Sequence, residues 1–133
     1  MGRRKPLRAA AAAALSLAVL ACSKSSTASG ATATVEYSVS PASAYFTQVT
    51  YTGASGQAVS VNDLSTFPGG KKDVSVSAKP FDAKISTVMN NTTAATITFT
   101  IAILVDGQVK AFTNGSAPPG VSAYTTSAEY MVQ

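Results

Sequence analysis

Residues 34–133 predict an all-β fold, an antiparallel immunoglobulin-like β-sandwich of seven or eight strands. The first observation is composition, because the 112 residues after position 21 hold 12 Val, 4 Ile and 16 Thr but only 2 Leu. β-branched side chains suit a pleated sheet, whereas a helical domain depends on Leu, Glu and Lys. The second observation is a two-residue alternation of apolar and polar side chains, and the third is the short spacing of Pro, Gly and Asn breaks.

Eight segments carry the alternation, and turn-forming residues separate them. In chain order they are residues 34–40, 45–52, 57–61, 71–78, 84–89, 95–105, 108–113 and 124–132. Breaks that end strand pairing stand at Phe67-Pro68-Gly69-Gly70, Lys79-Pro80 and Pro118-Pro119-Gly120. Segments of this length and spacing are typical of a sandwich rather than of alternating strands and helices.

The alternation also predicts which side chains face the core. In the second segment it groups Tyr45 and Thr47 with the inward-facing Val49 and Tyr51, which leaves Phe46 on the opposite face. The other side chains expected to point inward are Val35, Tyr37, Val39, Val59, Val61, Val74, Val76, Ala78, Ile85, Thr87, Met89, Tyr124, Ala128, Tyr130 and Val132.

The clearest strand is 95–105, in which the odd positions are Ala, Ile, Phe, Ile, Ile and Val. Asp106-Gly107 follows it and predicts a two-residue type I′ turn, because both positions of that turn need a positive φ. The next strand then returns antiparallel, and we expect Val109, Ala111 and Phe112 to pack against the sheet.

The first 22 residues form a pattern of their own. The segment before residue 9 carries four cations and no acid, namely Arg3, Arg4, Lys5 and Arg8. Residues 9–21 are apolar apart from Ser16, and as a helix they would span about 20 Å, short of the roughly 30 Å hydrocarbon core. This is the pattern of a secretory signal peptide. The run Val19-Leu20-Ala21-Cys22 resembles a bacterial lipobox, in which cleavage precedes an acylated Cys; the alternative is an ordinary signal peptide with a chance Cys.

The predicted organisation is therefore a lipoprotein signal peptide (1–21), an acylated Cys with a flexible Ser/Thr-rich tether (22–33) and a β-sandwich domain (34–133). The net charge of +4 lies entirely in the predicted signal peptide, because the domain and tether hold six Lys, six acidic residues and no Arg. A phosphate-binding surface needs clustered cations. We therefore exclude nucleic acid as a partner.

The residue inventory offers little chemistry. The chain has no His and one Cys, and no Ser stands three residues before a Lys. We expect no enzyme, no catalytic residue, no cofactor and no metal, and we rank a hydrolase last among the functions. Asp63, Asp73 and Asp82 would form a calcium site only if the fold brought them together; the alternative is three solvated turn residues.

A few side chains have competing interpretations. Phe46, Phe67 and Tyr45 are candidate contacts for a partner, and the alternative is that each packs in the core or at a sheet edge. Asn90, Asn91 and Asn114 each begin an N-x-[ST] triplet, which in a bacterial lipoprotein is better explained by the tendency of Asn to form turns.

Several stretches resemble one protein family. They are Val35-Glu36-Tyr37-Ser38-Val39, Gln48-Val49-Thr50-Tyr51-Thr52, Phe67-Pro68 before 72–78, and Ile103-Leu104-Val105-Asp106-Gly107-Gln108-Val109-Lys110. Over residues 33–133 the chain resembles the small mycobacterial membrane protein (MmpS) family and its lipoprotein relatives. The resemblance implies a small extracytoplasmic β-sandwich that is an accessory to proton-driven export pumps. Those members keep an uncleaved membrane helix and often a cysteine pair, which this chain lacks.

The sequence thus predicts a non-enzymatic, lipid-anchored envelope protein, an accessory to an export system. Its partners are then the membrane, through the lipid on Cys22, and an envelope transport protein. Ser23 is not the Asp that retains some lipoproteins at the inner membrane, which favours the outer membrane where one exists. The alternative is a free-standing surface or periplasmic module that binds a small ligand or glycan.

Overall fold

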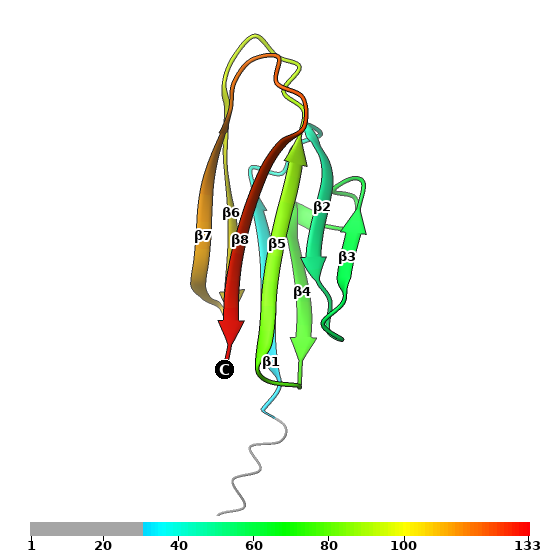
Figure 1. Cartoon of the computed structure of the whole chain (residues 1–133), viewed down its shortest axis with the longest axis vertical. Coiled ribbons are helices and arrows are strands. Elements are labelled where there is room, and N and C mark those ends of the chain that lie inside the picture. Colours follow the sequence, from blue (N-terminus) through cyan, green and yellow to red (C-terminus); the bar gives the residue numbers. More distant parts are fainter. Residues whose placement is uncertain (1–30) are drawn as a thin grey trace, which may run out of the picture.

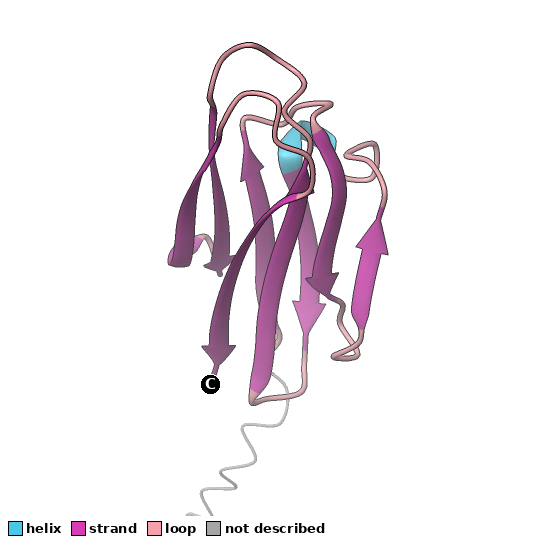
Figure 2. Ribbon diagram, turned by 45° about the horizontal axis from the view of Figure 1, so that its top comes forward, coloured by secondary structure: helices cyan, strands magenta, loops and turns pink. Residues whose placement is uncertain are grey.

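The computed structural model describes residues 31–133, which form two four-stranded antiparallel sheets packed face to face (Figure 1). The strands are β1 (Ala33–Ser40), β2 (Phe46–Thr52), β3 (Ala58–Val61), β4 (Lys71–Val76), β5 (Phe81–Met89), β6 (Ile97–Val105), β7 (Gln108–Ala117) and β8 (Tyr124–Val132). A single 3-10 turn, η1 (Pro68–Gly70), precedes β4 (Figure 2). The predicted all-β sandwich is confirmed, and each of the eight predicted segments corresponds to one strand.

The chain builds the two sheets by crossing repeatedly between them. One sheet has the order β4-β1-β6-β7 and the other has the order β3-β2-β5-β8, with every pair antiparallel. Only β2–β3 and β6–β7 are neighbours in both sequence and sheet. The sandwich is therefore held together by pairings between distant parts of the chain.

The two ends of the sandwich differ in what they carry. The lower end in Figure 1 holds the start of β1, the β4–β5 loop, the β6–β7 turn and the end of β8. The upper end holds η1 and the loops 41–45, 90–96 and 118–123 (Figures 1 and 2). No helix in the described residues is long and apolar enough to cross a bilayer.

The core is a layer of alternate side chains from the inner faces of both sheets. In β1 and β6 these are Val35, Tyr37, Val39, Phe99, Ile101 and Ile103, and in β2 and β5 they include Val49, Ala83, Ile85 and Met89. All are at most 3 % exposed. The alternation in the sequence is thus the pattern of a strand that buries one face and leaves the other in water.

A register shift in β2 corrects the predicted faces of that strand. The pairing of β2 with β5 slips between Phe46 and Gln48. Such a bulge adds one residue to one strand and turns the side chains beyond it to the other face. Phe46 therefore joins Val49 and Tyr51 in the core, while Thr47 is exposed.

A second shift corrects the prediction for β7. Ile103 pairs with Ala111 and Leu104 pairs with Val109, so that Lys110 has no opposite residue. Val109 and Phe112, predicted to pack on the sheet, are 58 % and 62 % exposed. The buried residues of β7 instead come later, at Gly115 and Ala117. Ala78, also expected to face inward, is exposed because β4 already ends at Val76.

The turn between β6 and β7 is confirmed as left-handed at both positions. Asp106 has φ 51° and Gly107 has φ 80°, as a type I′ turn requires. Asp106 also joins the turn to the start of β1. Its backbone N–H donates to the Thr34 carbonyl at 2.9 Å, and its Oδ1 accepts from the Thr34 N–H at 2.9 Å.

An aromatic side chain fills the space left by a glycine in β7. Gly115 pairs with Phe99, and a Cβ on Gly115 would lie 2.1 Å from Phe99 Cζ. The Phe99 ring also meets Phe46 edge-on, with centroids 5.1 Å apart, and Tyr124 at 6.1 Å. Only a residue without a side chain allows Phe99 to occupy this position.

Candidate functional site

The predicted site residues lie in three different environments. Cys22 and the signal peptide fall outside the described residues. Phe46 and Phe67 are 3 % and 1 % exposed, so both belong to the core. Tyr45 is half-buried and packs against the core at the upper end.

Phe46 and Phe67 nevertheless meet at one surface feature. A depression of about 540 Å³ lies between the loop that precedes β2 and the segment made of the loop 62–67 and η1. We call it the upper depression. Its lining combines the edges of Phe46, Phe67 and the half-buried Leu64 with small and polar residues, among them Ser43, Asn62 and Asp63. Two of the three sequence-predicted contacts, Phe46 and Phe67, thus line this depression, whereas Tyr45 does not.

Several contacts fix the position of Phe67 in the lining of the upper depression. The Phe67 ring meets Tyr51 nearly at right angles, with centroids 5.5 Å apart. The Phe67 N–H donates to the Leu64 carbonyl at 3.0 Å, and the Phe67 carbonyl accepts from the Gly70 N–H at 2.8 Å. Gly70 itself passes so close to β1 that a Cβ would lie 2.2 Å from the Val39 carbonyl oxygen. A partner would therefore meet a preformed surface.

Asp63 lies at the rim of this depression and accepts hydrogen bonds from within its own loop. Its Oδ1 accepts from the Ser65 N–H at 2.8 Å and from the Ser65 hydroxyl. These hydrogen bonds hold the pKa of Asp63 below its usual value. The fold does not unite Asp63 with Asp73 and Asp82, and within residues 31–133 no three acidic, Cys or His side chains form a group able to hold a metal.

A larger groove of about 810 Å³ crosses the outer face of the sheet β3-β2-β5-β8. We call it the side groove. Its lining includes the hydroxyl-bearing Thr50, Thr52, Ser86 and Ser127, and β7 contributes Ala111, Phe112 and Thr113. Thr113 Oγ1 donates to the Ser127 carbonyl at 2.9 Å, which joins β7 to β8 beside the groove. The sequence did not indicate this feature, because residues of five strands line it.

Charged residues of the side groove pair with one another. Lys84 Nζ lies 2.9 Å from Asp82 Oδ2 and 3.8 Å from Glu129 Oε2. The hydrogen bond to Asp82 is the main cause that raises the pKa of Lys84. Because all three side chains are well exposed, these pairs orient the groups more than they stabilise the fold.

The Asn91 side chain connects the loops of the upper end. The expectation that Asn91 is a turn former describes only part of this role. Its side-chain N–H groups donate to the carbonyls of Ala95, Ala117 and Pro118 at 2.8, 2.8 and 2.9 Å. Its Oδ1 accepts from the Thr93 backbone N–H at 2.9 Å and from the Thr93 hydroxyl at 2.7 Å. Asn91 is 1 % exposed, so its amide is a structural centre and is inaccessible to a modifying enzyme.

Comparison with known proteins finds no family model and no curated protein that matches this chain. The function must therefore be argued from the residues and from the geometry of the fold.

Proposed function

We propose that this protein is a lipid-anchored, non-enzymatic protein of the bacterial cell envelope that binds a protein partner through the upper depression. The anchor is supported by the run Val19-Leu20-Ala21-Cys22, which follows a basic and then an apolar segment. A Cys that carries several acyl chains stays stably in a membrane, whereas a single chain gives only marginal binding.

The observation that carries the proposal is the position of the upper depression relative to the start of the domain. The described chain enters β1 at the lower end, and the depression lies at the opposite end, among the loops that begin β2 and follow β3 (Figure 1). A domain held from its lower end presents its upper end away from the anchoring membrane. Phe46, Phe67 and Leu64 line a recess at that end.

The partner we propose is an envelope transport protein, in keeping with the MmpS resemblance, and the anchoring membrane is the outer membrane where one exists. A preformed apolar recess with a polar rim suits a side chain or short loop of another protein. In this proposal the sandwich contributes binding and no chemistry.

The anchor is tested with the Cys22→Ser variant. Cells fed radioactive palmitate should label the native chain, whereas the variant should lose the label and accumulate as unprocessed precursor. The Ser23→Ala variant is the matched control and should label normally. A Cys22→Ser protein that is processed and labelled like the native chain would contradict the anchor.

The partner site is tested by crosslinking in living cells. A photoreactive amino acid in place of Leu64 should give an adduct that contains a transport protein, and the same group in place of Ala54, exposed at the lower end, should not. Leu64→Asp should prevent co-purification of that transport protein. Adducts of equal yield from both positions would reject the upper depression as the site.

A second candidate is binding of a small polar ligand or glycan in the side groove. It is favoured by the hydroxyls of the groove and by the Asp82–Lys84–Glu129 group, which together match a ligand rich in hydroxyls. Maltotriose and chitotriose should then raise the melting temperature of the native protein. Lys84→Ala should remove that effect, while Lys72→Ala, on the other sheet, should retain it; an unchanged melting temperature with both sugars counts against this candidate.

A further inference from the structure

Three large apolar side chains of the described residues are strongly exposed, and all belong to the edge strands β7 and β8. Val109 is 58 % exposed, Phe112 62 % and Met131 44 %. We call these three residues the apolar edge. Exposed apolar groups that gather on one part of a surface mark a contact with another apolar surface.

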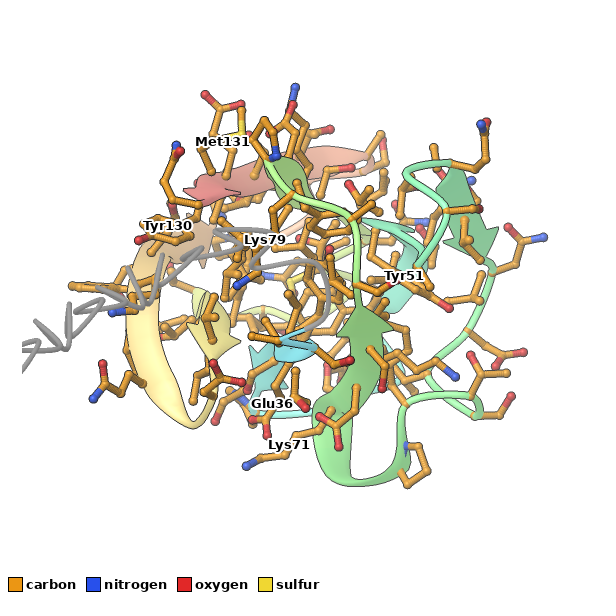
Figure 3. The ribbon with its side chains drawn as sticks, turned by 90° about the horizontal axis from the view of Figure 1, so that it is seen from below. Glu36, Tyr51, Lys71, Lys79, Tyr130 and Met131 are labelled. Carbon is orange, nitrogen blue, oxygen red and sulfur yellow. The ribbon has the colours of Figure 1, made fainter. Side chains whose placement is uncertain are left out.

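Val109 and Phe112 lie on the outer face of the sheet β4-β1-β6-β7, and Met131 lies on the outer face of the sheet β3-β2-β5-β8, on edge strands that meet along one side of the sandwich. β7 rises from the lower end and β8 descends to it (Figure 1), and Thr113 Oγ1 joins them through the Ser127 carbonyl. Val109 precedes Thr113 by four residues on β7, and Met131 follows Ser127 by four residues on β8. Each therefore lies about 13 Å along its strand from this contact, toward the lower end. Phe112 directly precedes Thr113. Seen from below, Met131 and Tyr130 lie on the β8 side of the sandwich, with Tyr130 toward β7 (Figure 3).

The apolar edge lies near the point where the domain meets its tether. Two hydrogen bonds between Asp106 and Thr34 join the β6–β7 turn to the start of β1. Ten residues lie between Cys22 and Ala33, and the eleven steps from one Cα to the next give a maximum reach of about 40 Å. A bilayer that held Cys22 would therefore be present at high effective concentration beside this edge, so that even a weak contact would be populated.

Two lysines near the edge suit an anionic bilayer surface, while the exposed Glu129, two residues before Met131 on the same face of β8, lies 3.8 Å from Lys84 Nζ. Lys110 lies between Val109 and Phe112 in β7, and Lys79 lies in the β4–β5 loop at the lower end (Figure 3). Neither lysine takes part in an ion pair within the described part of the chain. Lysines beside exposed apolar residues are typical of surfaces that insert shallowly among anionic headgroups.

We propose that the apolar edge rests on the bilayer that holds the acylated Cys22, with Lys110 against anionic headgroups. The inference depends on the proposed lipid anchor. In this arrangement the domain has a fixed orientation, because β7 and β8 contact the membrane and the upper depression faces away from it. Without this contact the domain would rotate freely on its tether.

The chain contains no Trp, so a single substitution supplies a specific fluorescent probe. The acylated Phe112→Trp protein is reconstituted into phosphatidylcholine–phosphatidylglycerol vesicles with and without brominated acyl chains. The matched control is Ala94→Trp, an exposed position in the upper loop between β5 and β6. Flotation of the vesicles reports separately whether each protein is anchored.

The Phe112→Trp protein should float with the vesicles and lose roughly half of its emission to the brominated lipid, since a shallow insertion places the ring near the acyl boundary. The Ala94→Trp protein should float and keep its emission. Adding Lys110→Glu to Phe112→Trp should reduce the quenching in vesicles that contain phosphatidylglycerol.

Flotation without quenching of the Phe112→Trp protein would overturn the apolar edge and leave the anchor standing. A blue-shifted emission that brominated lipid does not quench would assign the edge to a protein or to a second copy of this chain, and would also overturn it. Failure of both proteins to float would reject the anchor and this inference together.

Discussion

The hydroxyl of Tyr37 on β1 donates to the backbone carbonyl of Thr52 on β2 at 2.8 Å, across the interior of the sandwich. Tyr37 is fully buried, and its ring lies 5.3 Å from that of Tyr51, centroid to centroid. The bond thus joins the two sheets at a point where no water can take the place of either partner. Buried polar groups contribute to stability only while they are paired.

Removal of this hydroxyl should weaken the fold without creating a cavity. Tyr37→Phe keeps the ring but leaves the Thr52 carbonyl without its partner, and we expect the free energy of unfolding to fall by about 1–2 kcal/mol. Urea denaturation measures the change. Tyr45→Phe is the matched control, because no hydrogen bond of the Tyr45 hydroxyl occurs in the described residues. Equal stability of the Tyr37→Phe and native proteins would show that the bond contributes nothing.

The same buried hydroxyl predicts a loss of stability in alkaline solution. Burial raises the pKa of Tyr37 to about 12, above its ordinary value of 10.0. Between these two pH values the unfolded chain releases this proton while the folded state keeps it, so the free energy of unfolding falls as the pH rises. Below pH 10 the contribution is fully present. Urea midpoints measured from pH 9 to 12 should fall more steeply for the native protein than for Tyr37→Phe, and parallel curves would contradict this assignment.

Thr87 provides the opposite case, a buried hydroxyl without a partner. It is fully buried on β5, and its Oγ1 has no hydrogen-bond partner in residues 31–133. Thr87→Val replaces this hydroxyl by a methyl group of similar size and should stabilise the protein by about 1 kcal/mol. Thermal unfolding measures the difference.

The matched control for this substitution is Thr52→Val, since the Thr52 Oγ1 accepts from the Lys84 backbone N–H at 3.1 Å. That variant should lower the melting temperature, so the two Thr-to-Val changes should have opposite signs. A lower melting temperature for both would mean that the Thr87 hydroxyl is paired in solution.

Asn91 should be among the polar residues most sensitive to substitution. Asn91→Asp keeps an oxygen for Thr93 but places an anion against three carbonyl oxygens that now receive N–H groups. We expect a loss of about 3 kcal/mol or more at neutral pH, seen as a large drop in the melting temperature.

The neighbouring residue offers a control with the same chemical change. The Asn90 side chain only accepts, through Oδ1, from the Ala123 N–H at 2.8 Å, and an aspartate can do the same. Asn90→Asp should therefore change stability by about 0.5 kcal/mol or less. Equal losses for the two variants would show that charge alone, and not the loss of donors, is responsible.

Much of the fold could be predicted from local patterns. Alternation at Val35, Tyr37 and Val39 identified a strand and its buried face, because in a strand the side-chain direction depends only on the parity of the position. The Asp106-Gly107 pair identified a turn, since few residue pairs accept a positive φ at both positions. Strand alternation and turn formation depend on the residues of a short segment, so the sequence of that segment predicts them.

The predicted inward-facing side chains were wrong where the pairing of two strands shifts its register. The bulges beside Phe46 and at Lys110 reverse the parity, and they exist only in the pairing of β2 with β5 and of β6 with β7. No local pattern distinguishes a core Phe46 from an exposed Phe112. For the same reason the upper depression and the side groove could not be predicted, because loops and strands distant in sequence line them.

The sequence by itself therefore determined the class of fold, most strand limits, the turn at residues 106–107 and the pattern that suggests an acylated Cys22. The tertiary structure alone decided that Phe46 and Phe67 are core residues, that Asn91 ties the upper loops together, and that Val109, Phe112 and Met131 are exposed on the edge strands β7 and β8. The physical reason is that alternation and turn chemistry act over a few neighbouring residues. Burial and recesses instead depend on pairings between strands that lie far apart in the chain.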